Sequence, residues 1–557
     1  MSEVPEKLEI KQRFPLWKDW LKSITHKDIK PGIASFIATP KQVNSDFFRL
    51  PFGDVERDVF SEDWKLPENW KEIVLNEMKD TLEKNRAFKL FLDICVRCGA
   101  CGDKCHYYLG TGDPKNMPVM RAETVRSVYR YYFTTAGKLF GKWAGARPLD
   151  ENVIKEWYYY MFQCSLCRRC SLFCPYGIDT AEIVWWTRRI LSKIGINQRF
   201  MCISIEASSR VGNHLGLYPG GMAGSIEQAL SDIKDVTGFD LHAYINKKGA
   251  DILFVAPSGD YFASPHWYVF MGYLLLFSEL EERYGITVTW STYAGEGGNF
   301  GIFHSYEAGQ LLNSKIYKDA KRLGVKFILG GECGHMWRDK HQFINTMNNP
   351  PDHDEWKKFW EDPDLGHLSG HLKGIRFDSH VSAQNGWVHI LEFVAALIKH
   401  KKIDIDPSRN DHWKVTYHDP CNLARAVGLI EEPRYVIRSC CNYFYEMPEH
   451  AIREKTFCCG AGGVYLGDEM MELRVRGTMP RMMALRHVVK KYGVNMMLTP
   501  CAIDKAQFPH MVEYWKIPVQ IGGPMEMVGN ALVLTSFGEK PEDRKYDLRG
   551  NPIREEE

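Results

Sequence analysis

Cysteine spacing is the first indication of chemistry in this sequence. The chain contains 16 cysteines, and half of them fall in two runs with the same pattern, C-x2-C-x2-C-x3-C, at residues 95–105 and 164–174. Thiolates at this spacing are typical ligands of cubane 4Fe–4S clusters, and in two-cluster proteins the fourth cysteine of each run binds the cluster of the other run. The repeat therefore predicts two cubane clusters, close enough for an electron to pass between them.

Exchange of the fourth cysteine divides these residues into two sets of metal ligands. One set is Cys95, Cys98, Cys101 and Cys174, and the other set is Cys105, Cys164, Cys167 and Cys170. A pair of zinc sites is the alternative, but zinc takes its C-x2-C pairs from separate knuckles, and Pro175 follows the last cysteine of the second run as in ferredoxins. His106 stands where the first run would have that proline, a change that removes no ligand and could alter local hydrogen bonding.

A second group of cysteines lies much further along the chain. Its members are Cys421, the adjacent pair Cys458 and Cys459, and Cys501. Adjacent thiols cannot easily bind one iron together, but they can bind neighbouring irons of an open, irregular cluster. The pair is followed by glycines that let the backbone approach such a cluster closely or adopt positive φ, namely Gly460, Gly462 and Gly463. A phosphate-binding loop does not fit, because Tyr465 stands where G-x-G-x-x-G requires its third glycine. Buried structural cysteines are the remaining alternative.

Regular elements are expected to position this group. A strand at residues 414–417 leads towards Cys421. A helix at residues 481–492, opened by Pro480 and ended by Gly493, leads to a strand at residues 494–499, directly before Cys501. The group therefore has the order strand, Cys, Cys-Cys-Gly, helix, strand, Cys.

This order resembles the cysteine-rich CCG domain of the heterodisulfide reductase superfamily. In that family five cysteines hold a noncubane 4Fe–4S cluster, and the resemblance implies that Cys458 and Cys459 carry a catalytic cluster here. Four positions match the family pattern, and they are Cys421, Cys458, Cys459 and Cys501. Asp504 stands where the family has its last cysteine, so the fifth ligand is open.

Residues 250–340 look like a degenerate copy of the same domain. Strands are expected at residues 251–256 and 324–329, and the second strand leads to Cys333, the one cysteine of this stretch. Pairing of the two halves would bring Cys333 towards the cluster as a candidate fifth ligand or catalytic thiol, with a structural remnant as the alternative. His335 and His418 flank the proposed cluster and could transfer protons, although a structural role is the commoner one for a single histidine.

These modules define the predicted fold class, a multi-domain α+β chain. An α-helical ferredoxin-like dicluster domain is followed by two pseudo-symmetric α/β cysteine-rich (CCG) halves. The expected parts are an N-terminal extension for partner docking at residues 1–85, the dicluster domain at 86–215, the degenerate half at 245–400, the cluster-bearing half at 410–530 and a polar, extended tail at 538–557. In the extension, apolar residues around Trp17 could dock on a membrane subunit, with ordinary packing as the alternative.

Composition excludes several other classes. Lys+Arg of 71 and Asp+Glu of 70 leave a net charge of +1, which disfavours a nucleic-acid partner held by bulk charge. No apolar run is long enough to span a bilayer, and the N-terminus lacks the order of a signal peptide. We therefore expect a chain that stays in a reducing cytosol, where its cysteines bind metal rather than form disulfides.

The combination of modules is similar to the D subunit of heterodisulfide reductase. Its single complete CCG site brings it closer to the DsrK-type iron–sulfur subunits of the Hdr-like menaquinol-oxidising membrane complexes. The resemblance implies a peripheral subunit on the cytoplasmic side of the cell membrane, bound to a b-type cytochrome membrane subunit and to further complex subunits. Electrons from menaquinol would pass through haem and the two cubane clusters to the noncubane cluster. There a disulfide or trisulfide would be reduced, either a small one or one carried by a DsrC-like protein.

Two other classes use similar cysteine patterns. Electron-transfer iron–sulfur subunits of quinone-linked glycolate, lactate or glycerol-3-phosphate dehydrogenases contain the same modules but only relay electrons. In those relatives the first half more often keeps its cysteines. A zinc-bearing scaffold is the third class, and it would be colourless. The sequence contains no C-x-x-C-H haem attachment and no nucleotide-binding fingerprint, so haem and flavin would belong to other subunits.

Overall fold

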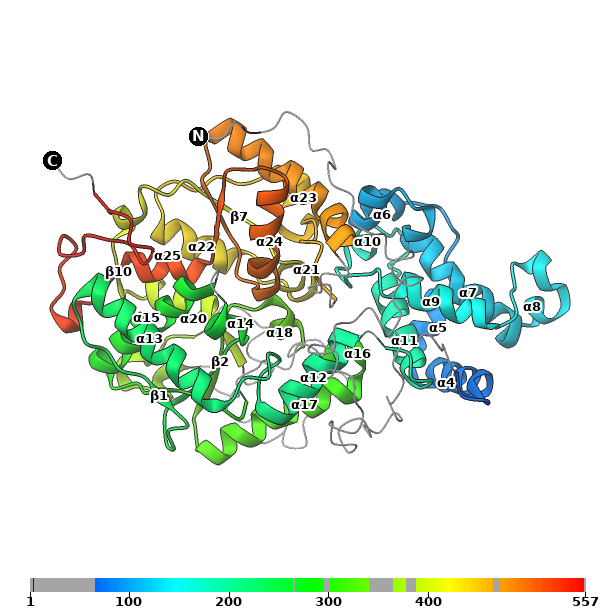
Figure 1. Cartoon of the computed structure of the whole chain (residues 1–557), viewed down its shortest axis with the longest axis horizontal. Helices are drawn as coiled ribbons and strands as arrows, with labels where there is room; N and C mark the ends of the chain where they lie inside the picture. The colour runs from blue at the N-terminus through cyan, green and yellow to red at the C-terminus, as the bar shows by residue number, and fades with distance from the viewer. Residues whose placement is uncertain are drawn as a thin grey trace, which may run out of the picture.

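The computed structural model describes Val4 and residues 66–197, 199–263, 266–294, 301–339, 364–376, 387–463 and 471–554. Figure 1 shows a helical lobe at one end of the molecule and a larger α/β body at the other. The N-terminal segment around Trp17, for which partner docking is predicted, lies outside the described residues. None of the described helices combines the length and the apolar content that a bilayer span requires.

The helical lobe contains both cubane cysteine runs. Its longer helices are α4 Trp70–Lys84, α5 Arg86–Asp93, α7 Pro118–Phe133, α9 Glu151–Met161 and α11 Thr180–Ser192. Its shorter helices are α6 His106–Thr111, α8 Thr135–Phe140 and α10 Arg169–Leu172, with 3-10 turns η1 Gly102–Lys104, η2 Pro114–Asn116 and η3 Gly141–Ala144. Asp150 and Asp179 cap α9 and α11 by accepting backbone N–H bonds. Two further helices, α12 Arg199–Val211 and α13 Pro219–Thr237, lead into the body.

The first half of the body is built on a parallel sheet in the order β1-β3-β2-β4-β5. The strands are β1 Tyr244–Ile245, β2 Ile252–Val255, β3 Val288–Trp290, β4 Phe327–Gly330 and β5 Trp387–His389. The helices are α14 Gly259–Phe262, α15 Trp267–Tyr284, α16 Gly301–His304, α17 Tyr306–Leu323, α18 Gly334–Arg338 and α20 Ile390–Lys399, with turns η7 Leu365–His367 and η8 Gly370–Leu372. Strands β2 and β4 are buried along their whole length, as expected for parallel strands covered on both faces.

The second half repeats this plan on a smaller parallel sheet in the order β7-β8-β9. The strands are β7 Val415–Tyr417, β8 Met496–Leu498 and β9 Gln520–Gly522. The helices are α21 Cys421–Val427, α22 Glu431–Cys440, α23 Met471–Tyr492, α24 Ala502–Tyr514 and α25 Pro524–Ala531. A short antiparallel pair, β6 Asp404–Ile405 and β10 Leu532–Val533, and turns η10 Pro407–Asn410, η11 Glu449–Ala451, η12 Arg453–Lys455 and η14 Thr535–Phe537 complete it. The predicted fold class is confirmed, while the domain boundaries stay predictions.

The two halves meet through close helix packing and a buried group of charges. Helices α15 and α25 cross at two glycines, where a β-carbon on Gly529 would lie 2.8 Å from the Gly272 α-carbon. Beside this crossing, Lys505 of α24 places its Nζ 3.2 Å from Glu332 Oε2 and 3.3 Å from Asp260 Oδ1 of the first half. We call these three residues the buried charge cluster. It ties the loop after β4 to the helix that follows β8.

Helix α23 corrects one prediction, because it begins at Met471 rather than at Pro480, which lies inside it. A proline within a helix leaves the carbonyl four residues earlier without its N–H partner, and here that residue is Arg476. Helix α6 packs on this turn so closely that a β-carbon on Gly110 would lie 2.0 Å from the Arg476 carbonyl oxygen. Helix α23 therefore continues through Pro480 at the point where helix α6 of the lobe packs on its backbone.

The C-terminal segment is also not the extended tail that the sequence predicted. Arg544, Asp547 and Leu548 are buried. Arg544 forms an ion pair with Glu539 at 2.9 Å, and Asp547 lies 2.8 Å from His412 Nε2. Charged residues are expected to be exposed because isolated charges are rarely buried, but these have partners that the sequence pattern does not reveal.

Candidate iron–sulfur centres

The first predicted ligand set lies in the helical lobe beside solvent. One small cavity is lined by all four of its members, Cys95, Cys98, Cys101 and Cys174. Arg97 and Gly99 have φ of 58° and 79°, so the loop curls in a way that can turn successive sulfurs inward. Cys98 is exposed and the other three cysteines are half-buried. The structure therefore brings the four residues together, and we call them the outer set.

The second predicted set lies deeper, between the lobe and the body, and we call it the inner set: Cys105, Cys164, Cys167 and Cys170. Leu166 and Arg168 have φ of 55° and 61°, which curls this loop as well. Burial raises the pKa of the Cys170 thiol, and the neighbouring thiols of Cys164 and Cys105 raise it further. Thiols this close cannot all ionise unless a cation stabilises them, which is the behaviour of a metal-binding donor set.

The third group lies at the carboxyl ends of β7 and β8. Cys421 begins α21 directly after β7, and Cys501 is the N-cap of α24 after β8. Cys458 and Cys459 lie on the loop before Gly460, whose φ is 84°. Carboxyl ends of parallel strands meet at the same edge of a sheet, so these thiols converge there. All four are buried, and we call them the CCG group.

Cys458 lies at the centre of the CCG group. Hydrogen bonds from the thiols of Cys167, Cys421 and Cys459 lower its pKa. Burial, together with the bond to Cys458, raises the pKa of Cys459. The protein alone thus supports one thiolate among several buried thiols, and further ionisation needs a bound cation. The donor chemistry fits a metal cluster at this place.

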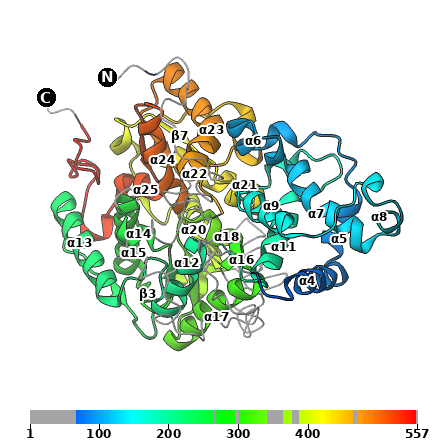
Figure 2. The same cartoon turned by 45° about the vertical axis from the view of Figure 1, so that its right-hand side comes forward.

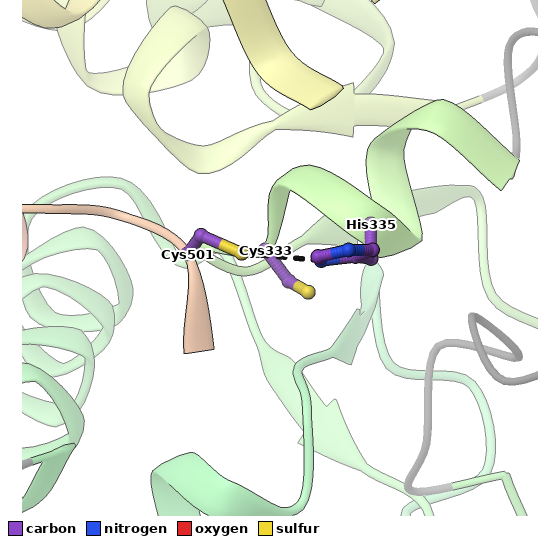
Figure 3. A group of neighbouring side chains, drawn as sticks. All are labelled: Cys333, His335 and Cys501. Atoms are coloured by element: carbon purple, nitrogen blue, oxygen red, sulfur yellow. Dashed lines mark hydrogen bonds between the residues drawn. The ribbon is translucent and has the colours of Figure 1, made fainter. Parts of the chain in front are cut away.

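Cys333 reaches the same place from the first half of the body. It is the N-cap of α18, just after β4, and Figure 3 shows it beside His335 and Cys501. One ligand atom from each of the three residues lies within 4.8 Å of the others, and His335 Nδ1 is 3.4 Å from Cys501 Sγ. The buried His335 Nε2 has no hydrogen-bond partner within the described part of the chain. Such an orphaned nitrogen beside thiols fits a bound metal, and the role of Cys333 as a fifth ligand stays a prediction.

Asp504 lies beside Cys459, another member of the CCG group. Its carboxylate accepts a hydrogen bond from Thr499 Oγ1 at 3.1 Å and lies 3.2 Å from His418 Nε2. The same carboxylate interacts with the Cys459 thiol. Burial lowers the pKa of His418, which favours its neutral ring. The residue that replaces the last family cysteine is therefore within reach of the adjacent pair, although its role also stays a prediction.

The inner set and the CCG group face each other across the contact between lobe and body. The Cys167 carbonyl accepts a hydrogen bond from Arg425 at 2.6 Å. The Leu166 carbonyl accepts one from Arg338 at 2.7 Å. These two arginines tie the inner loop to the body on both sides of the cysteine that contacts Cys458. No sequence pattern indicates them, because their partners are backbone atoms of a distant segment.

Helix α6 forms the other side of this contact. His106 Nε2 lies 2.9 Å from Ser165 Oγ, and its Nδ1 lies 3.0 Å from the Gly477 carbonyl oxygen. The Tyr107 hydroxyl donates to the Gly460 carbonyl at 3.0 Å. His106 therefore joins both cubane runs to the body, and its replacement of the expected proline was the one sequence signal for this contact.

Two family profiles match the chain, and together with the geometry they define its class. The 4Fe-4S dicluster domain covers residues 91–178, and the Cysteine-rich domain covers residues 415–507. The fold and the three cysteine groups are thus those of an iron–sulfur electron-transfer protein with a CCG module. No solved structure matches the chain.

Comparison with known proteins defines the family more closely. The chain is 81% identical, over its full length and that of the relative, to the Hdr-like menaquinol oxidoreductase iron-sulfur subunit of Archaeoglobus profundus. It is 73% identical over the same extent to iron-sulfur subunit 2 of the Archaeoglobus fulgidus enzyme. Over 67% of the chain and 78% of the relative, it is 25% identical to the D subunit of the dihydromethanophenazine:CoB–CoM heterodisulfide reductase of Methanosarcina mazei. The chain belongs to the family of Hdr-like menaquinol oxidoreductase iron–sulfur subunits, and the predicted resemblance is confirmed.

Proposed function

We propose that the chain is the catalytic iron–sulfur subunit of a membrane-bound, menaquinol-linked oxidoreductase that reduces a disulfide or trisulfide. In this proposal the outer and inner sets each hold a cubane 4Fe–4S cluster. The CCG group holds a noncubane 4Fe–4S cluster, with Cys333 as its candidate fifth ligand. Bound clusters would supply one-electron steps, which suit a quinol donor and the two-electron cleavage of an S–S bond.

The contact between Cys167 and Cys458 is the observation that carries the proposal. Each residue belongs to a different predicted ligand group, and the Cys167 thiol interacts with Cys458 strongly enough to lower the pKa of Cys458. Centres held by these residues would therefore be neighbours, whereas the outer set lies on the solvent side of the inner set. The order outer set, inner set, CCG group provides a route for electrons from the surface to the buried group.

The residues around the CCG group would exclude water and fix the thiols. A β-carbon on Gly463 would lie 3.0 Å from the Cys164 carbonyl oxygen, so the glycine loop packs directly on the inner run. A β-carbon on Gly462 would lie 3.5 Å from His335 Nε2. Side chains at these positions would separate the two cysteine groups. We expect the glycines to keep the path between them short and dry.

The names of the relatives support the proposed reaction. Menaquinol is named for the two relatives with the highest identity given above, and heterodisulfide reduction is named for the Methanosarcina subunit. We infer that this chain is a peripheral subunit on the cytoplasmic side of the membrane, that it receives electrons from a b-type cytochrome subunit, and that further subunits complete the complex. Its substrate would be a small disulfide or a sulfur chain on a DsrC-like protein.

Electron paramagnetic resonance of variants tests the proposal. Cys459→Ser should abolish disulfide reduction and the signal that a thiol induces in the oxidised protein, while the two cubane signals remain. Cys440→Ser is the matched control, because Cys440 is buried in a separate hydrophobic cluster of the core and belongs to none of the three groups. Unchanged turnover in Cys459→Ser, or equal loss in Cys440→Ser, would contradict the proposal.

Iron content distinguishes this function from a simple electron relay. Three clusters require about twelve irons per chain, whereas a dicluster relay requires about eight. The relay subunits of quinone-linked glycolate, lactate or glycerol-3-phosphate dehydrogenases are the alternative function. Anaerobic protein with about eight irons and no thiol-dependent signal would favour that alternative.

A further inference from the structure

A hairpin of the helical lobe exposes three large apolar side chains that no part of the described chain covers. It consists of α8 and η3, residues 135–144, and we call it the Trp143 hairpin. The exposed fractions of its apolar side chains are 73% for Leu139, 62% for Phe140 and 98% for Trp143. Figures 1 and 2 both show α8 at the far end of the lobe, away from the body.

The hairpin is held in shape by its own hydrogen bonds. Thr134 caps α8 by accepting the Gly137 N–H at 3.1 Å. The Ala146 N–H donates to the Gly141 carbonyl at 3.0 Å, and the Arg147 N–H donates to the Ser127 carbonyl of α7 at 3.0 Å. The apolar side chains are therefore presented on a fixed projection, and exposing them costs free energy in water.

The charges around the tip indicate what covers it. Lys138 and Lys142 are exposed beside the apolar residues, and residues 134–149 contain no acidic side chain. A tryptophan, a phenylalanine and a leucine beside lysines are the combination that enters the headgroup region of an anionic bilayer. A protein partner would need a preformed groove to receive this convex tip. A bilayer needs none, because it accepts the rings and pairs with the lysines at once.

The base of the hairpin is connected to the outer cysteine set. Arg130 donates to the Gly145 carbonyl at 3.4 Å and forms an ion pair with Glu123. Arg97, which lies between Cys95 and Cys98, pairs with the same carboxylate at 2.8 Å. Although burial raises the pKa of Glu123, Arg130 and Arg126 lower it below its usual range, so the carboxylate stays charged. One carboxylate thus connects the base of the hairpin to the outer loop.

We propose that the Trp143 hairpin inserts into the surface of an anionic lipid bilayer and holds the outer cysteine set next to the membrane. Leu139, Phe140 and Trp143 enter the boundary between headgroups and acyl chains, and the two lysines pair with lipid phosphates. Binding to lipid does not depend on the proposed function. Only the direction of electron flow, from the membrane into the outer set, rests on it.

Vesicle sedimentation with the full chain, purified anaerobically with its clusters, tests the proposal. The protein should sediment with vesicles of mixed phosphatidylglycerol and phosphatidylcholine, and far less with phosphatidylcholine alone. Lys138→Ala combined with Lys142→Ala should weaken the binding to anionic vesicles about 30-fold, because each surface lysine contributes about fivefold. Phe140→Ser combined with Trp143→Ser should abolish it. The matched control is Leu215→Ser with Tyr218→Ser, another exposed apolar pair between α12 and α13, which should bind as the unmodified chain does.

Fluorescence gives a second measurement. The difference between the unmodified chain and Trp143→Phe reports on Trp143 alone, and it should shift to shorter wavelength when anionic vesicles are added. The proposal is wrong when the unmodified chain does not bind vesicles, or when the hairpin and control variants bind equally. It is also wrong when the hairpin variants lose only binding to a purified membrane subunit, which would make the hairpin a protein contact. Cys459→Ser should bind vesicles normally, so failure of the proposed catalysis and failure of lipid binding are distinguishable.

Discussion

Replacing Lys505 by methionine would remove the positive charge that separates two buried carboxylates. The Lys505 Nζ lies 3.2 Å from Glu332 Oε2 and 3.3 Å from Asp260 Oδ1, and none of the three side chains has exposed surface. Methionine preserves most of the aliphatic stem, so the change is mainly electrostatic. Removing one member of a buried ion pair costs about 3–5 kcal/mol of unfolding free energy, because the remaining charge is left uncompensated.

Glu332 makes this loss depend on pH. Burial raises the pKa of Glu332 to about 8, although the nearby Lys505 lowers it, whereas the ordinary value is 4.5. Between these two values the folded chain keeps a proton that the unfolded chain has lost, so stability falls as pH rises from about 4.5 to about 8. Without Lys505 the pKa of Glu332 rises further. Above about pH 8 the unmodified chain has released this proton while the variant still holds it, so the deficit of the variant should grow only above that pH.

Guanidinium unfolding of the anaerobic protein, followed by tryptophan fluorescence at about pH 7 and about pH 9, measures the effect. The control is Lys326→Met, which breaks the more exposed pair with Asp251 at 2.7 Å and should cost about 0–1 kcal/mol. Adding Glu332→Gln to Lys505→Met should recover part of the loss, because glutamine can still accept the Met525 N–H bond without a charge. A midpoint for Lys505→Met that falls no further than that of Lys326→Met would refute the reasoning.

Two further changes test the contact between the lobe and the body, and a third tests the CCG group. Gly110→Ala should destabilise the protein by about 1–3 kcal/mol, because the new β-carbon meets the α23 backbone. The control is Gly224→Ala, at a helical glycine with open space around it, which should not destabilise the protein. Thermal unfolding midpoints compare the two variants. Tyr107→Phe removes the bond to the Gly460 carbonyl and should cost about 0.5–1.5 kcal/mol in the same assay, so a larger loss would indicate a role beyond that bond. Asp504→Cys restores the five-cysteine family pattern and should alter the thiol-dependent paramagnetic signal while both cubane signals persist; identical spectra would show that Asp504 does not contact the cluster.

The cysteine groups could be predicted from sequence because metal ligation imposes short, fixed spacings. Residues within one run, such as Cys164 and Cys167, must reach one cage from one loop, so their separation carries most of the information. The convergence of Cys421 and Cys501 could be expected for a similar reason, since each directly follows a strand of the same sheet. In both cases local chemistry and chain direction suffice, and distant contacts add little.

Other features depend on partners that the sequence does not place. Pro480 was expected to open a helix, but α23 runs through it where α6 packs on its backbone. Lys505 looks like an ordinary charged helical residue, and nothing near it in the sequence indicates Glu332 or Asp260 as partners. The C-terminal segment was misjudged in the same way, because Arg544 is buried against Glu539. In each of these cases a buried contact that no local sequence pattern indicates determined the structure.

The three cysteine groups are buried to different extents, and this affects how the protein loses activity when it is exposed to oxygen. Cys98 of the outer set is open to solvent, whereas Cys458 and Cys459 are covered. With the proposed clusters bound, oxygen would therefore damage the one held by the outer set first and interrupt the supply of electrons, while the one held by the CCG group stays intact. Aerobically handled samples should then look inactive with a physiological donor yet respond to a small artificial reductant that bypasses the damaged end.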